Sequence, residues 1–305
     1  MEGPKAHQNF AFLENEPRQL LWITGYESKV FDVENPSSEL KDFMCHSNLD
    51  LDMAKHRSLF NWKKYPSDRL FTLSEGRQSI QFPKGFGIPV YSDEVFNIFS
   101  QALNHNIEEP NVDIKIENNI SFIRDSQKTE PMKPLFKSAT NVMVLIKGKD
   151  GYYNVPEGNP EKHGHGSSWG INAKKKSQRD KYGREFSAFW VVPSGRHVYR
   201  TLATQWMKIP FDTRAHYISA HVHPFAESIA LRDLQTGEII FESSIKNKTD
   251  KIGLLQVSSL SSEEGVPLHK DREYELISIY NNTSGKYIGV MAVLFLYLQD
   301  KEIQK

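Results

Sequence analysis

The segment Tyr217-Ile218-Ser219-Ala220-His221-Val222-His223 shows most directly how this chain folds. Its apolar residues Ile218, Ala220 and Val222 alternate with the two histidines, and side chains alternate between the two faces of a β-strand. The pattern therefore predicts a strand whose apolar side chains enter a core. It also predicts that His221 and His223 project together from the opposite face.

Alternating or β-branched and aromatic runs recur along the chain between turn residues. They predict strands at 18–33, 40–50, 70–82, 113–124, 141–147, 186–192, 197–204, 216–232, 238–244, 274–281 and 286–299. A helix is expected at 93–103, where Val95, Phe96, Phe99 and Leu103 recur at helical spacing, although a loop leading into a strand also fits. Many short strands and few helices indicate an all-β sandwich or barrel.

Length and charge narrow the class of protein. The 305 residues exceed what one core usually serves, so we expect two domains, 1–130 and 131–305, joined through the proline-containing stretch 125–138. The polar stretch 148–183 is expected to be a long insertion, either mobile or a lid. The 38 basic residues balance 38 acidic ones, and this zero net charge argues against a nucleic-acid partner.

The sequence also bears on membrane insertion, export and disulfide formation. The longest apolar run, 289–298, is too short to cross a bilayer, so no membrane span is expected. No signal peptide is visible in 1–10. The single cysteine, Cys45, excludes an intrachain disulfide framework and a cysteine-rich zinc site. The 11 histidines, several of them in short-spaced pairs, are the candidates for chemistry.

His221 and His223 form the strongest local pattern. Two imidazoles at i and i+2 on one strand face can bind a metal ion together, and the ordinary alternative is a pair of hydrogen-bonded structural histidines. Met291 lies in the apolar strand predicted at 286–299, where a methionine usually packs in a core. Its thioether is a soft ligand that favours Cu(I), so two histidines and Met291 would select copper over zinc or magnesium.

In the first half, the metal-ligand candidates are Cys45, His46, His56 and His105. For each histidine alone, a structural role is the simpler interpretation. Cys45 follows Phe43 and Met44, which favours a small buried hydrophobic residue over a reactive thiol. His163 and His165 could also bind metal, but their glycine-rich surroundings favour ordinary loop residues.

Several short motifs follow one another in a distinctive order. Pro83-Lys84-Gly85-Phe86-Gly87 precedes His105 by about twenty residues, Val192-Pro193-Ser194-Gly195 follows, and His216 then precedes the His221–His223 pair. Met291 comes about seventy residues further on. In this order and spacing, from about residue 40 to the C-terminus, the chain resembles the copper type II, ascorbate-dependent monooxygenases, the family of peptidylglycine α-hydroxylating monooxygenase and dopamine β-monooxygenase.

This resemblance implies two tandem antiparallel jelly-roll β-sandwich domains, with one copper ion in each, across a water-filled cleft. It implies that His221, His223 and Met291 bind the copper that activates dioxygen and takes hydrogen from a C–H bond of the substrate. A first-domain copper, held in the family by three histidines, would relay the second electron from ascorbate.

The chain also departs from the family pattern. The family's adjacent histidine pair in the first domain is replaced by Cys45-His46, so one expected ligand is lost. Either Cys45, His56, His163 or His165 substitutes for it, or the site is incomplete. At the family's carboxylate-binding positions the chain has Ser219, Val293 and Phe295. A small or apolar substrate is therefore expected in place of a peptide carboxylate.

The sequence is compatible with two functions of different classes. The first is a copper-dependent monooxygenase, with one or two copper ions, dioxygen, a small-molecule substrate and ascorbate as reductant. The second is a non-catalytic double jelly-roll protein that binds copper, a glycan or another protein. Copper–oxygen chemistry would suit a periplasmic or secreted protein, and without a visible signal peptide a cytoplasmic one also fits. The oligomeric state is left open.

Overall fold

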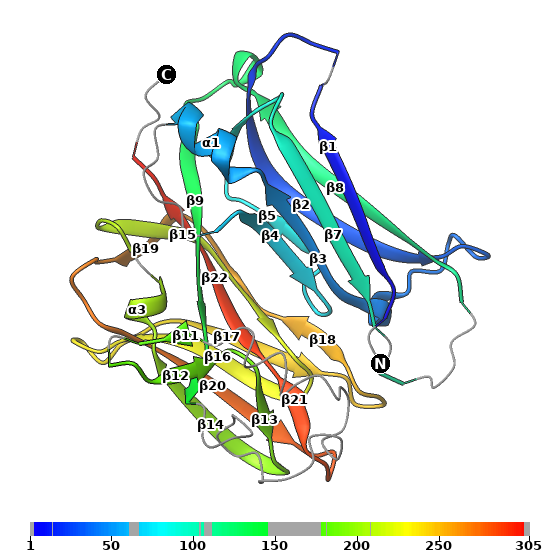
Figure 1. The fold of residues 1–305 in the computed structure, drawn as a ribbon, viewed down its shortest axis with the longest axis vertical. Coiled ribbons are helices and arrows are strands. Elements are labelled where there is room, and N and C mark those ends of the chain that lie inside the picture. Colours follow the sequence, from blue (N-terminus) through cyan, green and yellow to red (C-terminus); the bar gives the residue numbers. More distant parts are fainter. Residues whose placement is uncertain are drawn as a thin grey trace.

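β-Strands form most of the chain, as the alternating patterns predict. The computed structural model describes residues 3–13, 15–60, 67–103, 105–106, 112–145, 178–180, 182–207 and 209–301 (Figure 1). The elements of the first half are β1 (Lys5–Ala11), β2 (Leu20–Asp32), η1 (Lys41–Phe43), β3 (Met44–Leu51), α1 (Met53–Phe60), β4 (Arg69–Ser74), β5 (Ser79–Gln81), β6 (Phe86–Tyr91), β7 (Val95–Ala102), β8 (Ile114–Arg124) and η2 (Asp125–Gln127).

In the described residues, the second half continues with strands and the short helix α3. Its elements are β9 (Lys133–Asn141), β10 (Val144–Leu145), β11 (Gln178–Arg179), β12 (Glu185–Ser187), β13 (Trp190–Val192), β14 (Gly195–Leu202), α3 (Thr204–Met207), β15 (Thr213–Val222), β16 (Ala226–Asp233), β17 (Ile239–Asn247), β18 (Leu254–Val257), β19 (Leu260–Leu268), β20 (Tyr274–Asn282), β21 (Ile288–Val290) and β22 (Ala292–Gln299).

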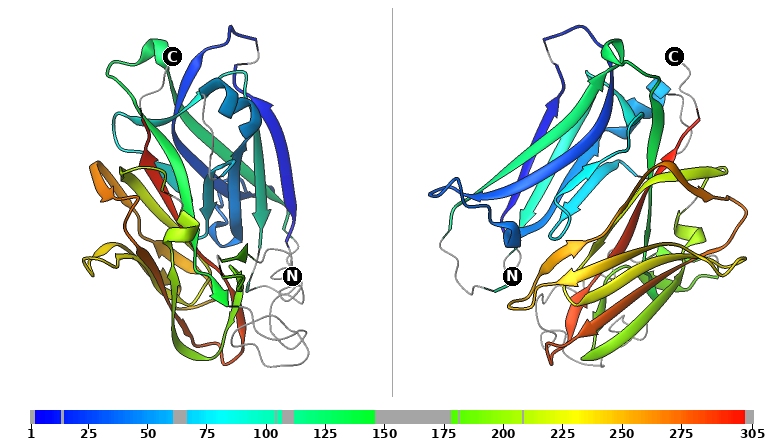
Figure 2. Two further views of the ribbon diagram at one scale, coloured as in Figure 1. Left: turned by 60° about the vertical axis from the view of Figure 1, so that its left-hand side comes forward. Right: turned by 180° about the vertical axis from the view of Figure 1, so that it is seen from behind.

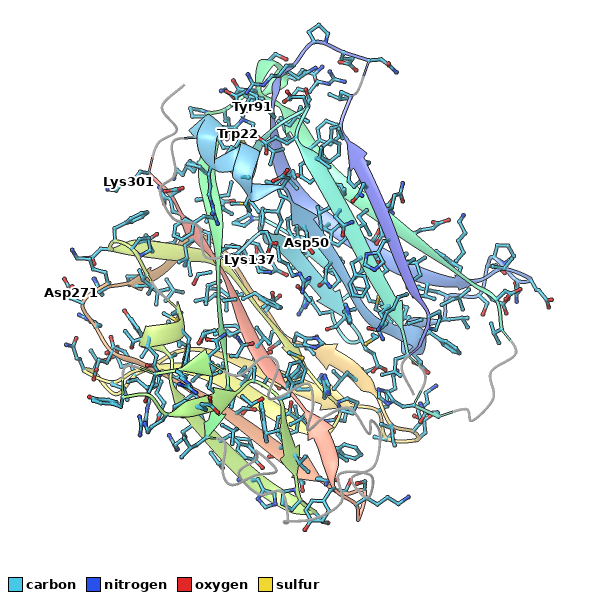
Figure 3. The ribbon with its side chains drawn as sticks, in the orientation of Figure 1. Trp22, Asp50, Tyr91, Lys137, Asp271 and Lys301 are labelled. Atoms are coloured by element: carbon cyan, nitrogen blue, oxygen red, sulfur yellow. The ribbon has the colours of Figure 1, made fainter. Side chains whose placement is uncertain are left out.

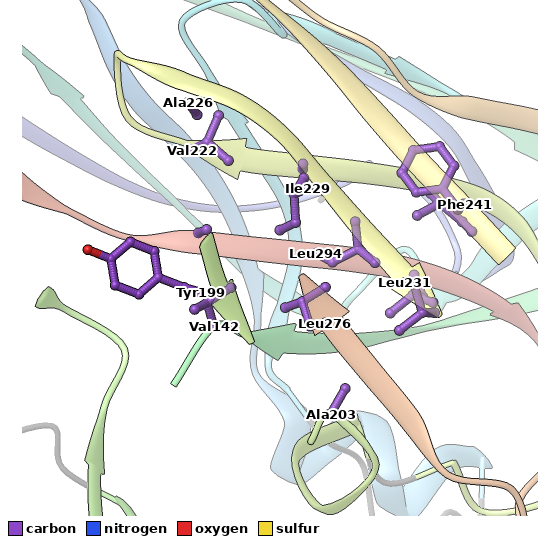
Figure 4. Packing of buried hydrophobic residues seen from close by; sticks show 14 of the residues in the cluster. Val142, Tyr199, Ala203, Val222, Ala226, Ile229, Leu231, Phe241, Leu276 and Leu294 are labelled. Carbon is purple, nitrogen blue, oxygen red and sulfur yellow. The ribbon is translucent and has the colours of Figure 1, made fainter. Parts of the chain in front are cut away.

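The second half is a complete jelly roll. One sheet has the order β19-β15-β22-β9 and the other has the order β14-β20-β16-β17, extended by β18. The chain crosses between two opposed four-stranded sheets, which is the jelly-roll arrangement. Apolar side chains from both sheets fill the space between them, including Val222, Ile229, Leu276 and Leu294 (Figure 4). The expectation of antiparallel jelly-roll sandwiches is confirmed.

The first half repeats this arrangement with one strand fewer. Its front sheet has the order β1-β7-β3-β4, equivalent to β14-β20-β16-β17. In its back sheet β2 pairs with β8 on one side and with β5 and β6 on the other, as β15 pairs with β22 and β19. Within the described ranges, no strand lies on the outer side of β8, where the second jelly roll has β9 beside β22.

A buried polar network ties the first jelly roll together. Asn118 on β8 accepts hydrogen bonds from the hydroxyls of Tyr26 and Ser47, each at 2.8 Å, and Ser47 also contacts the Ser100 hydroxyl at 2.9 Å. Every buried hydroxyl that finds a partner avoids the cost of desolvation. The network therefore fixes β8 against β2, β3 and β7.

The two jelly rolls are packed against each other along a continuous contact, which we call the seam. β6 of the first pairs in parallel with β9 of the second, from Phe86 with Lys133 onward, so one sheet continues across both (Figure 2). Phe71 and Phe82 of the first half stack around Tyr297, at ring separations of 5.6 and 4.8 Å. The Tyr297 hydroxyl donates to the carbonyl of Leu70 at 2.9 Å. This part of the seam is filled by aromatic side chains.

The β4–β5 hairpin closes the rim of the seam. The Gly76 carbonyl accepts from the Val257 amide at 3.0 Å, and Arg77 donates to the Val257 carbonyl. Lys248 reaches back to Glu75 at 2.5 Å and to Asp42. These ion pairs and backbone bonds hold the first jelly roll against β18.

One expectation from the sequence needs correction. The predicted helix 93–103 is wrong, because Val95–Ala102 is the strand β7, in which Phe96, Ile98, Ser100 and Ala102 alternate inward, and the alternative of a loop leading into a strand describes this segment. The stretch 125–138, in which a domain boundary is expected, holds η2 and then most of β9, a buried strand that starts the second jelly roll. The insertion predicted at 148–183 lies largely outside the described residues. None of the helices in the described part is long and apolar enough to span a membrane.

Candidate metal centre

β15 places His221 and His223 on the seam side of the second jelly roll. Ile218, Ala220 and Val222, on the other face, are buried in the core, as predicted. The two imidazole rings lie 5.6 Å apart between centres and are nearly perpendicular, at 83°. Period-2 alternation therefore brings both histidines to one face, as the sequence indicated.

Met291 lies beside this pair on the neighbouring strand. β15 and β22 are antiparallel, with His221 opposite Val293 and Val222 opposite Ala292 as the last pair of the ladder, and His223 and Met291 are the residues directly beyond that pair. The Met291 side chain packs on the seam side, with the core of the first jelly roll. Between the two backbones the Tyr280 hydroxyl donates to the Met291 carbonyl at 2.8 Å and accepts from the His223 amide at 3.3 Å. The three residues thus share one face and adjacent strands.

Both imidazoles are held in their neutral form. Burial lowers the pKa of His223 to about 4. Burial also lowers the pKa of His221 well below its ordinary value. Mutual repulsion between His221 and His223, and the nearness of His46, act in the same direction on His221. A histidine must be neutral to bind a metal ion. Because both imidazoles are already neutral at pH 7, metal binding requires no loss of a proton from them.

The hydrogen bonds of the two rings differ. His223 Nδ1 lies 3.3 Å from the carbonyl oxygen of Gly289, which selects the tautomer with a proton on Nδ1 and leaves Nε2 as a lone-pair donor. His221 Nδ1 is buried and has no hydrogen-bond partner among the atoms of the described chain. A buried, unpaired polar atom is costly, and a ligand would remove that cost.

The first jelly roll contributes His46 to the same neighbourhood. His46 lies on the outer face of β3, stacked near Phe99 at 5.2 Å, and is close enough to lower the pKa values of His221 and His223. Its neighbour Cys45 sits in a bulge of β3, with its sulfur 3.3 Å from His46 Nδ1. Burial raises the pKa of the Cys45 thiol to about 11, so the thiol is protonated at neutral pH.

The other described histidine candidates lie at opposite ends of the β3–β7 pair. His56 in α1 is buried against Glu94, with its Nδ1 2.5 Å from the carboxylate. His46 and Leu51 are five positions apart on β3, roughly 17 Å, and α1 begins beyond the Leu51 end. His46 and His56 therefore cannot share a metal ion. His105 lies three residues beyond the other end of β7, where Gln101 pairs with His46. His163 and His165 lie outside the described residues.

His216, part of the resemblance, is separated from the pair by a bulge in β15 between Ala215 and Tyr217. Its ring stacks on Phe86 at 3.9 Å. Its two nitrogens contact the Ser262 carbonyl at 3.0 Å and the Gln299 amide oxygen at 3.1 Å. With both nitrogens engaged, His216 acts as a structural histidine.

The surroundings of Met291 are mostly apolar. The residues at the family's carboxylate-binding positions are Ser219, Val293 and Phe295, all buried on the seam side. Sequence reasoning missed Lys137, whose ammonium nitrogen lies 4.2 Å from the centre of the Phe295 ring (Figure 3). A lysine within a stretch with two prolines indicated a linker, and only the strand pairing of β9 shows that it is buried.

Histidine, cysteine and carboxylate side chains do not form a metal site by themselves: the described part of the chain contains no group of three or more placed to hold an ion. The candidate centre is therefore the pair His221 and His223 with a thioether beside it.

Comparisons with known proteins identify no family. No family model matches the sequence. No curated protein matches it either. Among solved structures, the major capsid protein P2 of bacteriophage PM2 aligns over 99% of both chains, with 9% identity and a TM-score of 0.34. A structure from Sulfolobus Turreted Icosahedral Virus aligns over 99% of this chain and 58% of its own, with 8% identity and a TM-score of 0.19. Sequence identities and TM-scores this low give no information about function.

Proposed function

We propose that this chain is a non-catalytic double jelly-roll protein that binds one copper ion, in its reduced state, through His221, His223 and Met291. The observation that carries the proposal is the pairing of β15 with β22: its last pair, Val222 with Ala292, is followed directly by His223 and Met291, and Met291 packs on the seam side, where His221 also lies. Two imidazoles and a thioether are a soft donor set, which suits Cu(I) better than zinc or magnesium.

Protonation and orientation support the same assignment. Both imidazoles are neutral at pH 7, because burial lowers their pKa values. The contact of His223 with the Gly289 carbonyl is the kind of outer contact that orients metal-binding histidines. The unpaired Nδ1 of His221 gives this residue a further reason to accept a ligand.

Hydroxylation of a C–H bond is not part of the proposal. It would need a second redox centre to deliver an electron from ascorbate. The first-half candidates His46 and His56 lie at opposite ends of β3, and Glu94 already engages His56. The seam, where the family has a water-filled cleft, is packed with aromatic rings around Tyr297. A small-molecule substrate, dioxygen and a periplasmic or secreted location stay predictions from the resemblance.

Anaerobic titration with Cu(I) against a chromophoric chelator tests the proposal. We expect one copper per chain, and Met291→Ala should weaken Cu(I) binding on the order of 10- to 100-fold, because even outer contacts of metal ligands have effects of this size. Cu(II) binding should weaken far less, since a thioether contributes little to the harder ion.

Met132→Ala is the matched control, because Met132 is also half-buried and lies away from β15. His46→Ala and His105→Ala should leave the stoichiometry at one. Two coppers per chain, with one lost in His105→Ala, would support a monooxygenase instead. Unchanged Cu(I) affinity in both Met291→Ala and His221→Ala would overturn the proposed site.

A further inference from the structure

The two halves of the chain differ at one position of the jelly roll. In the second half β22 is flanked by β15 and β9. In the first half the equivalent strand β8 pairs with β2, and no other strand of the described residues reaches its outer edge. One strand position of the first jelly roll is therefore open, over the 11 residues Ile114–Arg124.

The open edge is apolar as well as unpaired. Ile120 and Phe122 face the first core but are only partly buried, as are Phe10 and Phe12 beside them. Val33, Val112 and Ile123, which lie on or next to β8, are among the exposed large hydrophobic residues, at 51%, 38% and 37% exposure. A long edge strand with apolar neighbours is a template for strand addition.

The backbone groups that point outward can be assigned. The Val33 amide donates to the Asp113 carbonyl at 2.9 Å, so Asp113 is a hydrogen-bonded position of the β2–β8 ladder. Such positions alternate along an antiparallel pair, which places the amides and carbonyls of Ile114, Ile116, Asn118 and Ile120 on the open side.

We propose that β8 pairs with β8 of a second copy of this chain, antiparallel about a two-fold axis at Asn118. This register suits the sequence on both faces. On the core side it pairs Ile114 with the partner's Phe122 and Ile116 with the partner's Ile120. On the outer side it pairs Lys115 with the partner's Ser121 and Glu117 with the partner's Asn119. Between Ile114 and Phe122, apart from Asn118 on the axis, apolar thus meets apolar and polar meets polar, and each copy supplies the edge that the other lacks.

Opposite substitutions at Ser121 test this register. Ser121 is exposed, and the Thr24 hydroxyl donates to its backbone carbonyl and not to its side chain, so a new side chain leaves the fold intact. Ser121→Lys places a lysine opposite the partner's Lys115 twice per dimer, and Ser121→Glu places a carboxylate there. We expect the dimer Kd, measured by analytical ultracentrifugation, to rise roughly three- to tenfold in the first and to fall similarly in the second. Lys115→Glu combined with Ser121→Lys should restore the dimer.

A second variant tests the backbone pairing. Ile116→Pro removes an outward amide without removing a bond to β2, and an edge strand tolerates proline at such a position. It should abolish the dimer, whereas Gln8→Lys on the edge strand β1 should not change it. Amides of Ile116, Asn118 and Ile120 should be protected from hydrogen exchange only at dimer-forming concentrations. A protein that is monomeric at every concentration, or a dimer indifferent to both Ser121 substitutions, would overturn the proposal.

Discussion

Lys137 is the residue whose environment is least expected from its type. It is 3% exposed, on the seam face of β9, with the Phe295 ring below its ammonium group. No carboxylate of the described residues lies within ion-pair distance of it, although Asp50 faces it across the seam (Figure 3). Burial, helped by the charge of Arg69, lowers the pKa of Lys137 to about 7. The seam therefore contains an amine that is half neutral at physiological pH.

Lys137→Met should stabilise the protein near neutral pH. The folded pKa of about 7 lies below the ordinary value of 10.5, so the folded state binds fewer protons than the unfolded chain between these values. Stability of the native sequence therefore rises with pH from 7 to 10.5 on account of this group. The variant should gain on the order of a few kcal/mol at pH 7 and below, and the gain should vanish as pH approaches 10.5. Urea unfolding of both proteins across this range measures the difference, and a difference independent of pH would refute the assignment.

Among the elements, the β4–β5 hairpin depends on a single glycine. Gly76 has φ +78°, a conformation that side chains rarely adopt, and a Cβ there would lie 3.1 Å from Leu254 Cβ and Val257 Cγ2. The hairpin tip therefore contacts β18 of the other jelly roll at a distance only a glycine permits. Gly85 has a similar φ of +80° with nothing near its Cβ position.

These two glycines form a matched pair. Gly85→Ala should cost only backbone strain, about 1 kcal/mol. Gly76→Ala should cost that strain and also displace β18, for a total of about 2–3 kcal/mol. Chemical denaturation of the two variants measures both values. Equal losses would mean that the hairpin tip does not contribute to the contact between the jelly rolls.

The sequence predicted the alternating strand β15 and the apolar strand β22, but it mistook β7 for a helix and missed β9 and β19. The alternation in β15 was sufficient to place His221 and His223 on one face, because strand period alone decides it. β9 was missed because Pro134 and Lys137 look like linker residues, although six of its nine positions are buried. β19 was missed because it is an edge strand that carries the polar run Ser261–Glu264. The approach of His46 to His221 depends on tertiary packing, which no local pattern contains.

At the scale of the whole molecule, the seam makes the two halves depend on each other. The second half presents Tyr217, Phe295 and Tyr297 toward the first, and all three are buried there. The rim adds the bonds between Asn106 and Ile252, at 2.9 and 3.0 Å. An interface of this kind resembles a core more than a transient contact.

Fragments 1–130 and 131–305 should therefore associate when produced together. Alone, the second fragment exposes the aromatic face of Tyr217, Phe295 and Tyr297 and should aggregate. Co-expressed, an affinity tag on one fragment should recover both in equal amounts, and Tyr297→Lys should prevent this. Two soluble fragments that never bind each other would show that the seam adds little stability.

The parallel pairing of β6 with β9 has a consequence for synthesis on the ribosome. β9 and β6 emerge close together, whereas β22, the other neighbour of β9, is made only after residues 142–291. Local contacts form before distant ones, because closing a shorter loop costs less entropy. β9 therefore has a place to dock while the rest of its own jelly roll does not yet exist. We therefore expect the first half to hold this apolar strand, through the pairs of Phe86 with Lys133 and Gly87 with Pro134, until β22 is made.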